Sequence, residues 1–489
     1  MFSKHNPNHA RAARDSGGDL FEALEPRKLL SGTSTLSEAL YMPEGFSAPS
    51  VVEVVELAYS DDSGSADWEL WVHYERDGAG EEIVCIADGT LAAGETESIG
   101  VWGDGASLVR ADEPYSLVLR SSTDDVTALL RHSDFGAETA QYFVEAGDDS
   151  YVIPGLRRDD DSSRDFVVFH NAGDDDATVR LELEDNGGRT YVYQQTVLGG
   201  RRGGWNLQQM NDLPEGVFTA RVTSENMIVL AGTRYALERN VATIELPNQT
   251  LAAAGALLDA EFDGGGGPDE DTTFFIANPS DTAIEIRFRT VQRDDGTISG
   301  PATFTAMVGA NDSTTVSLRE VGFNGGDDDF GIVYEADAPI AVSVVTERRS
   351  NLIFNQPETR ASESWFFDQG LIERLRDDEL RTEDVYLFNP TATSQDVTIT
   401  FNFANGTRIV ETKSLDSLEV EDVDGRIDGI GGLPIDLPTG GLAFTISIQS
   451  TGPLVAMLAH WDPIDRASAA TSQGVPTGTV LDLVDIAVF

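Results

Sequence analysis

Short runs in which apolar and polar residues alternate recur along most of the chain. Residues 283–289 (AIEIRFR) and residues 397–401 (VTITF) alternate without interruption. A period of two residues is typical of a strand that buries one face. The first run leads to Asp-Gly at 295–296 and the second to Asn-Gly at 405–406. Both pairs favour the positive φ of a short hairpin turn, so the pattern predicts antiparallel hairpins.

The strand pattern repeats along the chain. Asn278 and Asn389 each follow an apolar run, each precede a proline, and lie 111 residues apart. Asn171 ends a similar run 107 residues before Asn278, and Ser60 ends another 111 residues before Asn171. An asparagine at the end of a strand can bond the backbone of the following turn. We therefore expect these four residues to occupy one equivalent position in four copies of a repeat.

Two further landmarks keep the same order in each copy. An aromatic or apolar residue followed by an acid and a glycine opens the copies, at residues 41–45, 142–147, 258–264 and 365–370. An apolar strand closes them, at residues 125–130, 226–230, 339–345 and 453–458. About seven short strands in roughly 100 residues are typical of an antiparallel sandwich.

The sequence therefore predicts an all-β protein. We expect four tandem antiparallel β-sandwich modules, Ig-like and about 110 residues each, after a flexible N-terminal targeting segment. The expected boundaries are 1–36 for the targeting segment and 37–138, 139–254, 255–361 and 362–489 for the sandwiches. Polar, glycine-rich linkers at 252–272 and 348–364 favour small interfaces and hence an elongated array.

One alternative architecture is disfavoured, and three further secondary-structure elements are expected. A four-bladed propeller fits less well, because its blades need only about 40 to 50 residues each. Residues 372–384 (IERLRDDELRTED) are expected to form a short charged helix, and residues 8–30 another. Residues 479–489 are expected to add a last strand to the fourth sandwich.

The net charge of the chain limits the kinds of molecule that it is expected to bind. Thirty-three Lys and Arg residues stand against 84 Asp and Glu residues, a formal net charge of -51. Nucleic acid and anionic lipid are therefore not expected partners. Lys4, Lys28 and Lys413 are the only lysines. An acidic, lysine-poor surface suits a protein kept soluble in high salt, where the screening length falls to about 3 Å near 1 M, although a GC-rich genome would produce the same bias.

The chain lacks the sequence signatures of catalysis and of covalent bracing. Cys85 is the single cysteine and lies in an apolar run, which excludes an intramolecular disulfide and predicts a buried thiol. No nucleophile elbow, phosphate-binding loop or His-Glu-x-x-His occurs. The six histidines are dispersed, and His132 and His460 fall in the closing segments of two different copies. We expect no enzymatic activity, no catalytic residue and no cofactor.

Acidic clusters and tryptophans leave two binding chemistries open. Residues 174–176 and 327–329 are aspartate triplets beside turns, and residues 422–429 alternate carboxylates with glycine. Solvated turns are the first interpretation and weak calcium binding the alternative, although no bidentate Glu falls at the spacing of a twelve-residue calcium loop. Five tryptophans could be core residues or sugar platforms: Trp68, Trp71, Trp102, Trp205 and Trp461.

The N-terminal segment carries a short motif. Residues 1–20 have no apolar stretch of the kind that a conventional secretory signal needs, and no run approaches the roughly 18 apolar residues of a transmembrane helix. Residues 21–31 (FEALEPRKLLS) resemble the LEPR-XLL signature of large bacterial surface and secreted repeat proteins. The matching positions include Leu24, Glu25, Pro26, Arg27, Leu29 and Leu30.

The repeat resembles the bacterial surface modules whose units begin with a Trp-Tyr-Phe-Ala-Glu-Gly strand and continue to a strand that ends in Asn-Pro. No copy keeps every landmark intact. The resemblances imply the module architecture and a secreted or surface location only. Together with the four-fold repeat, the acidic composition and the lack of a catalytic set, they predict a non-enzymatic structural or adhesive repeat protein of a salt-adapted bacterium, with other surface components or polysaccharide as partners. A carbohydrate-binding surface protein and a weakly calcium-binding module array remain alternatives.

Overall fold

The structure is a computed structural model that describes residues 36–486 with internal gaps. The gaps are 61–62, 76–81, 104, 135–136, 146, 160–161, 238–240, 246–250, 264–270, 293–299, 324–326, 349–350, 375–379, 404–405, 425–441, 462–468 and 474. Nearly all described residues lie in or between antiparallel strands. The short 3-10 helices η1 (Leu207–Gln209) and η3 (Leu483–Asp485) are exceptions. The predicted all-β fold is confirmed.

Strand pairing divides the described chain into four strand groups, numbered here in chain order. Group one holds β1 (Glu38–Met42), β2 (Val52–Tyr59), β3 (Ser65–Tyr74), β4 (Ile83–Ala92), β5 (Thr96–Gly103), β6 (Ala106–Ser107), β7 (Tyr115–Ser121), β8 (Val126–Asp134) and β9 (Ala137–Tyr142). Group two holds β10 (Asp148–Asp159), β11 (Ser163–Asn171), β12 (Ala177–Asp185), β13 (Thr190–Val197), β14 (Arg202–Asn206), β15 (Gly216–Ala236) and β16 (Val241–Glu245).

The second half of the chain continues the series. Group three holds β17 (Ala252–Asp263), β18 (Asp271–Asn278), β19 (Ile284–Gln292), β20 (Thr303–Val308), β21 (Asp312–Ser317), β22 (Asp327–Arg348) and β23 (Asn351–Asn355). Group four holds β24 (Arg360–Arg374), β25 (Leu380–Phe388), β26 (Gln395–Phe403), β27 (Arg408–Leu415), β28 (Val420–Asp424), β29 (Leu442–Trp461), β30 (Ala469–Gln473), β31 (Val475–Pro476) and β32 (Val480–Asp482).

The same pairing order recurs in all four groups. Group one has the sheets β4-β3-β7-β1 and β6-β5-β2-β8-β9. In group two the orders are β13-β12-β15-β10 and β14-β11-β15-β16, so the long strand β15 takes the places of both β7 and β8. The strands β22 and β29 do the same in groups three and four.

Each group buries apolar side chains between its two sheets. In β19 the predicted alternation places Ile286 and Phe288 in the core and leaves Glu285 exposed. These two residues belong to one apolar cluster with Phe274 and Ile276 of β18, which lies in the other sheet. The period-two pattern therefore fixes which face of each strand turns inward.

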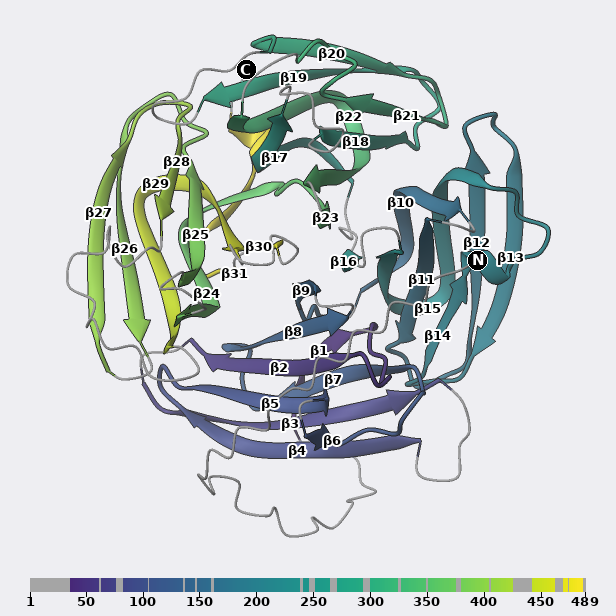
Figure 1. Cartoon of the computed structure of the whole chain (residues 1–489), viewed down its shortest axis with the longest axis vertical. Coiled ribbons are helices and arrows are strands. Elements are labelled where there is room, and N and C mark those ends of the chain that lie inside the picture. Colours follow the sequence, from purple (N-terminus) through teal and green to yellow (C-terminus); the bar gives the residue numbers. More distant parts are fainter. Residues whose placement is uncertain are drawn as a thin grey trace, which may run out of the picture.

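The four groups lie around a common centre, with the last regular strand of each group innermost (Figure 1). These inner strands, β9, β16, β23 and β30, contact one another in succession, and β30 contacts β9. The amide Nε2 of Gln141 on β9 donates to the backbone oxygen of Ile244 on β16 at 2.8 Å. The arrangement is a closed ring of four groups.

Neighbouring groups meet through corresponding strands. The ring of Tyr41 on β1 lies 5.2 Å from the ring of His170 on β11, between centroids. Gly155 of β10 packs against Phe275 of β18, and β17 contacts β25. The strand β24 of group four contacts β2 and β8 of group one. The opening strand of each group therefore faces the second strand of the next, and the last contact closes the ring.

Two expectations about shape and helix content are wrong. The supposed linkers at 252–272 and 348–364 contribute to β17, β23 and β24, and the ring replaces the elongated array. Residues 372–384 hold the end of β24 and the start of β25 rather than a helix. Ile372 pairs with Leu442 and Asp384 with Ala459, both on β29, so tertiary pairing overrides local helix propensity.

Two predicted element positions, at the start of group two and at the end of the chain, differ from the structure. Tyr142 ends β9 and does not open group two; the opening strand there is β10. The register of β10 shifts between Ile153 and Leu156, just as that of β24 shifts between Phe367 and Gly370. At the far end, β32 pairs with β24 as expected, but the strand stops at 482 and η3 follows.

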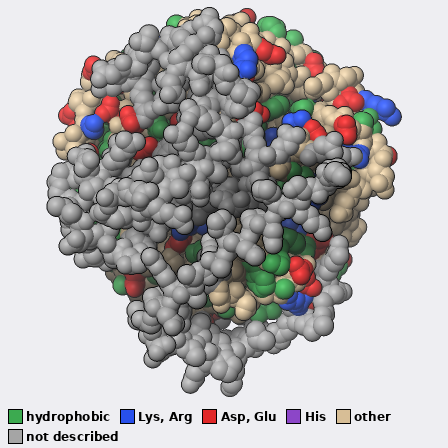
Figure 2. All heavy atoms as spheres, viewed as in Figure 1, with side chains coloured by type: hydrophobic (Ala, Val, Ile, Leu, Met, Phe, Trp, Pro, Cys, Tyr) green, Lys and Arg blue, Asp and Glu red, His purple; other side chains and the backbone are tan. Residues whose placement is uncertain are grey.

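Among the residues that the structure describes, no helix has the length and apolar character to cross a membrane. Charged side chains of both signs lie along the rim in the view down the ring (Figure 2).

Candidate functional site

The targeting motif of residues 24–30 lies outside the described residues. The candidate site residues must therefore come from the folded strand groups. Polar side chains at repeated positions are the first set, and those at the junctions between groups are the second.

The repeated asparagines end their strands as expected. Asn278 is fully buried, and its Nδ2 donates to the backbone oxygens of Thr282 at 2.7 Å and Gly309 at 2.8 Å. Its Oδ1 accepts from the backbone nitrogen of Ser280 at 2.9 Å. Asn171 and Asn389 make the same contact to the backbone oxygen four residues ahead, each at 2.9 Å. The predicted turn-capping role is confirmed for these three residues.

In the remaining copy, group one, the equivalent position is displaced by one residue from the expected alignment. Tyr59, not Ser60, faces the core in group one. The hydroxyl of Tyr59 donates to the backbone oxygen of Ser63, again four residues ahead, at 3.2 Å. Its backbone oxygen accepts from Gly94, as that of Asn389 accepts from Leu418. The register of the strand decides the equivalence, whereas residue similarity had suggested Ser60.

A second repeated position lies six residues before the first, on the same strands. Here a residue of one strand pairs in register with a residue of the group's long or closing strand. The pairs are Glu53 with His132, Asp165 with Arg234, Thr272 with Thr346, and Glu383 with His460. The recurrence of His132 and His460 thus reflects one backbone position that is paired with an acidic residue in both groups.

The Glu53 pair is completely buried. His132 Nδ1 lies 3.0 Å from Glu53 Oε1, which also accepts from the backbone nitrogen of Phe46 at 3.0 Å. The hydroxyl of Tyr115 donates to Glu53 Oε2. Burial alone would lower the pKa of His132, but the hydrogen bond and the charge of Glu53 outweigh it, and the pKa is raised. The contact with Glu53 therefore favours the protonated form of His132.

The Asp165 pair is a buried ion pair of different chemistry. Arg234 Nη2 donates to Asp165 Oδ2 at 2.6 Å, and Arg234 Nε to Oδ1 at 3.0 Å. Arg234 also donates to the backbone oxygen of Gly155 at 2.6 Å, and its guanidinium carbon lies 4.9 Å from the ring centroid of Phe354 in group three. This pair ties β11 and β15 to the opening strand and to the next group.

A further charged cluster lies between groups one and two. Arg202 of β14 donates to Glu75 at 2.6 Å and to the backbone oxygen of Pro43 at 3.0 Å, and its Nη2 lies 3.5 Å from Glu44 Oε2. Arg202 and Glu44 are both buried. Burial raises the pKa of Glu44, although the charge of Arg202 opposes the shift. The cluster is a junction that joins two groups.

Three neighbouring polar side chains at the same junction make buried hydrogen bonds. Ser116 Oγ lies 2.8 Å from His170 Nδ1, and His73 Nδ1 lies 2.6 Å from the backbone oxygen of Gly200. Burial lowers the pKa of His73 to about 4 and holds that of His170 well below its usual range. Ser116 and His170 resemble a nucleophile and base in spacing, but Ser116 is fully buried and His170 nearly so. Substrate has no access to them.

A pocket of about 500 Å³ opens between groups two and three. Group two supplies Arg157, Asp159 and Ser163, and group three supplies Phe275 and Glu347. Other lining residues are Gly155, Ser162, Val217, Arg234, Ala236, Thr273, Val345 and Leu352. The volume lies within the range of about 300–1,000 Å³ typical of small-molecule sites.

The tryptophans fall in cores and junctions. Trp68 and Trp71 are buried, and Trp102 and Trp205 are half-buried. The side chain of Trp461 lies outside the described ones. Cys85 is half-buried, and its thiol donates to the backbone oxygen of Ala87 at 3.3 Å.

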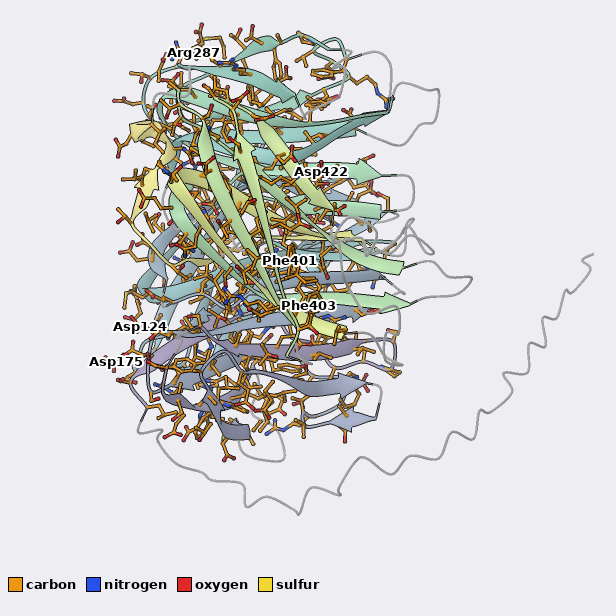
Figure 3. All side chains as sticks on the ribbon, turned by 90° about the vertical axis from the view of Figure 1, so that its left-hand side faces the viewer. Asp124, Asp175, Arg287, Phe401, Phe403 and Asp422 are labelled. Carbon is orange, nitrogen blue, oxygen red and sulfur yellow. The ribbon has the colours of Figure 1, made fainter. Side chains whose placement is uncertain are left out.

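Two of the acidic turn residues lie on one side of the ring. Asp124 and Asp175 lie on turns of groups one and two at the same face (Figure 3). Asp422 instead lies in β28, paired with Tyr386. Where the structure describes side chains, no group of three or more His, Cys, Asp or Glu residues is placed to hold a metal ion.

The sequence did not single out the buried pairs or the pocket. Asp165 and Arg234 are ordinary charges in alternating strands, and only their common spacing from Asn171 and from the closing strand marks them. The pocket joins residues from two groups, so no local pattern could have indicated it.

Comparisons with known proteins assign no family. No family model matches the chain, and no curated protein matches it. A solved structure titled "Crystal Structure of Thermotoga maritima 1070" aligns at 21% identity, over 24% of this chain and 97% of that chain, with a TM-score of 0.20. At that score the likeness supports no inference about fold or activity.

Proposed function

We propose that the protein is a non-enzymatic structural or adhesive repeat protein of the bacterial exterior. Its four strand groups are four Ig-like β-sandwich modules, and residues 1–36 direct the chain outward. The observation that carries this proposal is the use of polar residues at repeated positions. Asn171, Asn278 and Asn389 each bond their own turn from a buried position.

The buried charged and histidine side chains described above support the same proposal. His132, Asp165 and Arg234 bond side chains inside one group, whereas Arg202 and His170 bond or contact residues of the neighbouring group. Groups that would supply acid–base chemistry in an enzyme are here joined in fixed, buried pairs. A protein built in this way resists load and presents its exposed surface to partners.

Two measurements on cells test the proposal. An antibody against the folded chain should label intact cells, and a fusion of residues 1–36 to a reporter should export the reporter. Replacing Leu24, Glu25, Pro26 and Arg27 together by alanine should retain the reporter inside. Labelling only after lysis would contradict the surface location, and loss of a metabolic activity on deletion would contradict the non-enzymatic role.

A further inference from the structure

The pocket between groups two and three is lined by side chains that the architecture alone leaves unexplained. Ser163, at the start of β11, is 4% exposed, and its Oγ has no hydrogen-bond partner among the described residues. The adjacent Ser162 Oγ is likewise buried and unpaired there. A buried hydroxyl without a partner costs free energy. Both serines line the pocket, and a rotation about χ1 is the movement that would turn either hydroxyl toward a ligand there.

An aromatic side chain forms part of the opposite wall. Phe275 of β18 is half-buried and lines the pocket. Its ring lies so close to Gly155 that a Cβ added there would stand 2.5 Å from the ring Cγ. Gly155 also has φ +87°, in the region that favours glycine. The close approach of strand and ring therefore depends on glycine, and Val345 and Leu352 extend the apolar wall.

Both arginines that line the pocket are already paired with carboxylates. Arg157 Nη2 bonds Asp159 Oδ2 at 2.6 Å, and Arg234 bonds Asp165. Glu347 is the remaining charged lining residue. A strongly anionic ligand would have to compete with these carboxylates for the arginines. The same groups can exchange hydrogen bonds with a neutral ligand at little electrostatic cost.

We propose that this pocket binds an uncharged sugar, or a similar polyol, of monosaccharide size. An apolar wall from Phe275 receives the C–H face of such a ligand, and Ser162, Ser163 and the carboxylate of Asp159 bond its hydroxyls. This pattern of an apolar wall with a few placed polar groups is general for small-molecule sites. The inference rests on the pocket alone and does not depend on where the protein is located.

Titration of the purified full chain tests the proposal. Glucose, galactose and N-acetylglucosamine are the neutral probes, and glucuronate and glucosamine are their charged counterparts. Binding of each is measured by saturation-transfer NMR and calorimetry. At least one neutral sugar should bind, and Ser163→Ala should weaken it by about five- to tenfold, the loss of one hydrogen bond. Since Ser163 Oγ has no partner among the residues that the structure describes, this substitution should leave the melting temperature unchanged or higher.

A second serine supplies the matched control. Ser116 is also buried, but its Oγ is bonded to His170, and it does not line the pocket. Ser116→Ala should lower the melting temperature and leave sugar binding unchanged. Absence of neutral-sugar binding, equal affinity in Ser163→Ala, or tighter binding of a charged counterpart would each overturn the proposal.

Discussion

Replacing Asn278 by alanine tests whether the repeated asparagine holds each strand group together. The substitution removes donors to two backbone oxygens, at 2.7 and 2.8 Å, and an acceptor for the backbone nitrogen of Ser280. Each buried group left without a partner costs about 1–3 kcal/mol, so the local loss should be about 3 kcal/mol or more. Tyr59→Phe removes a single hydroxyl donor in group one and should cost about 1 kcal/mol.

Hydrogen exchange followed by mass spectrometry is the suitable assay, because a chain of four groups need not unfold in one step. Asn278→Ala should increase exchange in β18 and β19 and leave group one protected. Asn402→Ala is the control, since Asn402 is exposed on β26 between the buried Phe401 and Phe403 (Figure 3). An effect of Asn278→Ala no larger than that of Asn402→Ala would refute the capping role.

Four further outcomes are expected. His73→Gln should reduce the loss of folding stability between pH 6.5 and 4. The fold lowers the pKa of His73, so the stability that its neutral form contributes is present above pH 6.5 and is lost as the pH falls. Equal melting temperatures of the variant and the unaltered protein at each pH below 6 would refute this. Arg234→Met should destabilise by about 3–5 kcal/mol by leaving a buried carboxylate unpaired, and adding Asp165→Leu should restore most of it in urea unfolding; no recovery would contradict the pair. Sodium chloride near 1 M should raise the melting temperature by screening the net charge of -51, and a shift with millimolar calcium that magnesium does not reproduce would instead indicate coordinated calcium. Solution scattering should give the compact profile of the ring, and a rod-like profile would contradict the closure between groups four and one.

Sequence patterns predicted the strands and the repeated asparagines because these depend on short-range rules. The alternation at 283–289 and the polar residue after an apolar run are set by which face of a strand is buried. The exchange of Ser60 for Tyr59 shows the limit of that reasoning. Two adjacent residues can both end a strand, and only the pairing register shows which one faces the core.

The ring and the pocket depend on contacts between residues far apart in the chain. Gly155 and Phe275 lie in different groups, so the pattern within one repeat could not indicate their contact. The segment at 372–384 has helical propensity, but Ile372 and residues 382–384 pair with β29, and residues 373–374 pair with residues 380–381. Composition likewise carries no information on how the groups meet.

The contact between β24 and β2 has a consequence for assembly. Each group meets the next head to tail, and such heterologous contacts either close after a fixed number of steps or continue into a filament. Here the fourth step returns to the first group, so both complementary faces are covered within one molecule. A chain from which group four was deleted would expose one face of each kind. The exposed face of one molecule would then bind the complementary face of another, and the monomer would become the subunit of a polymer.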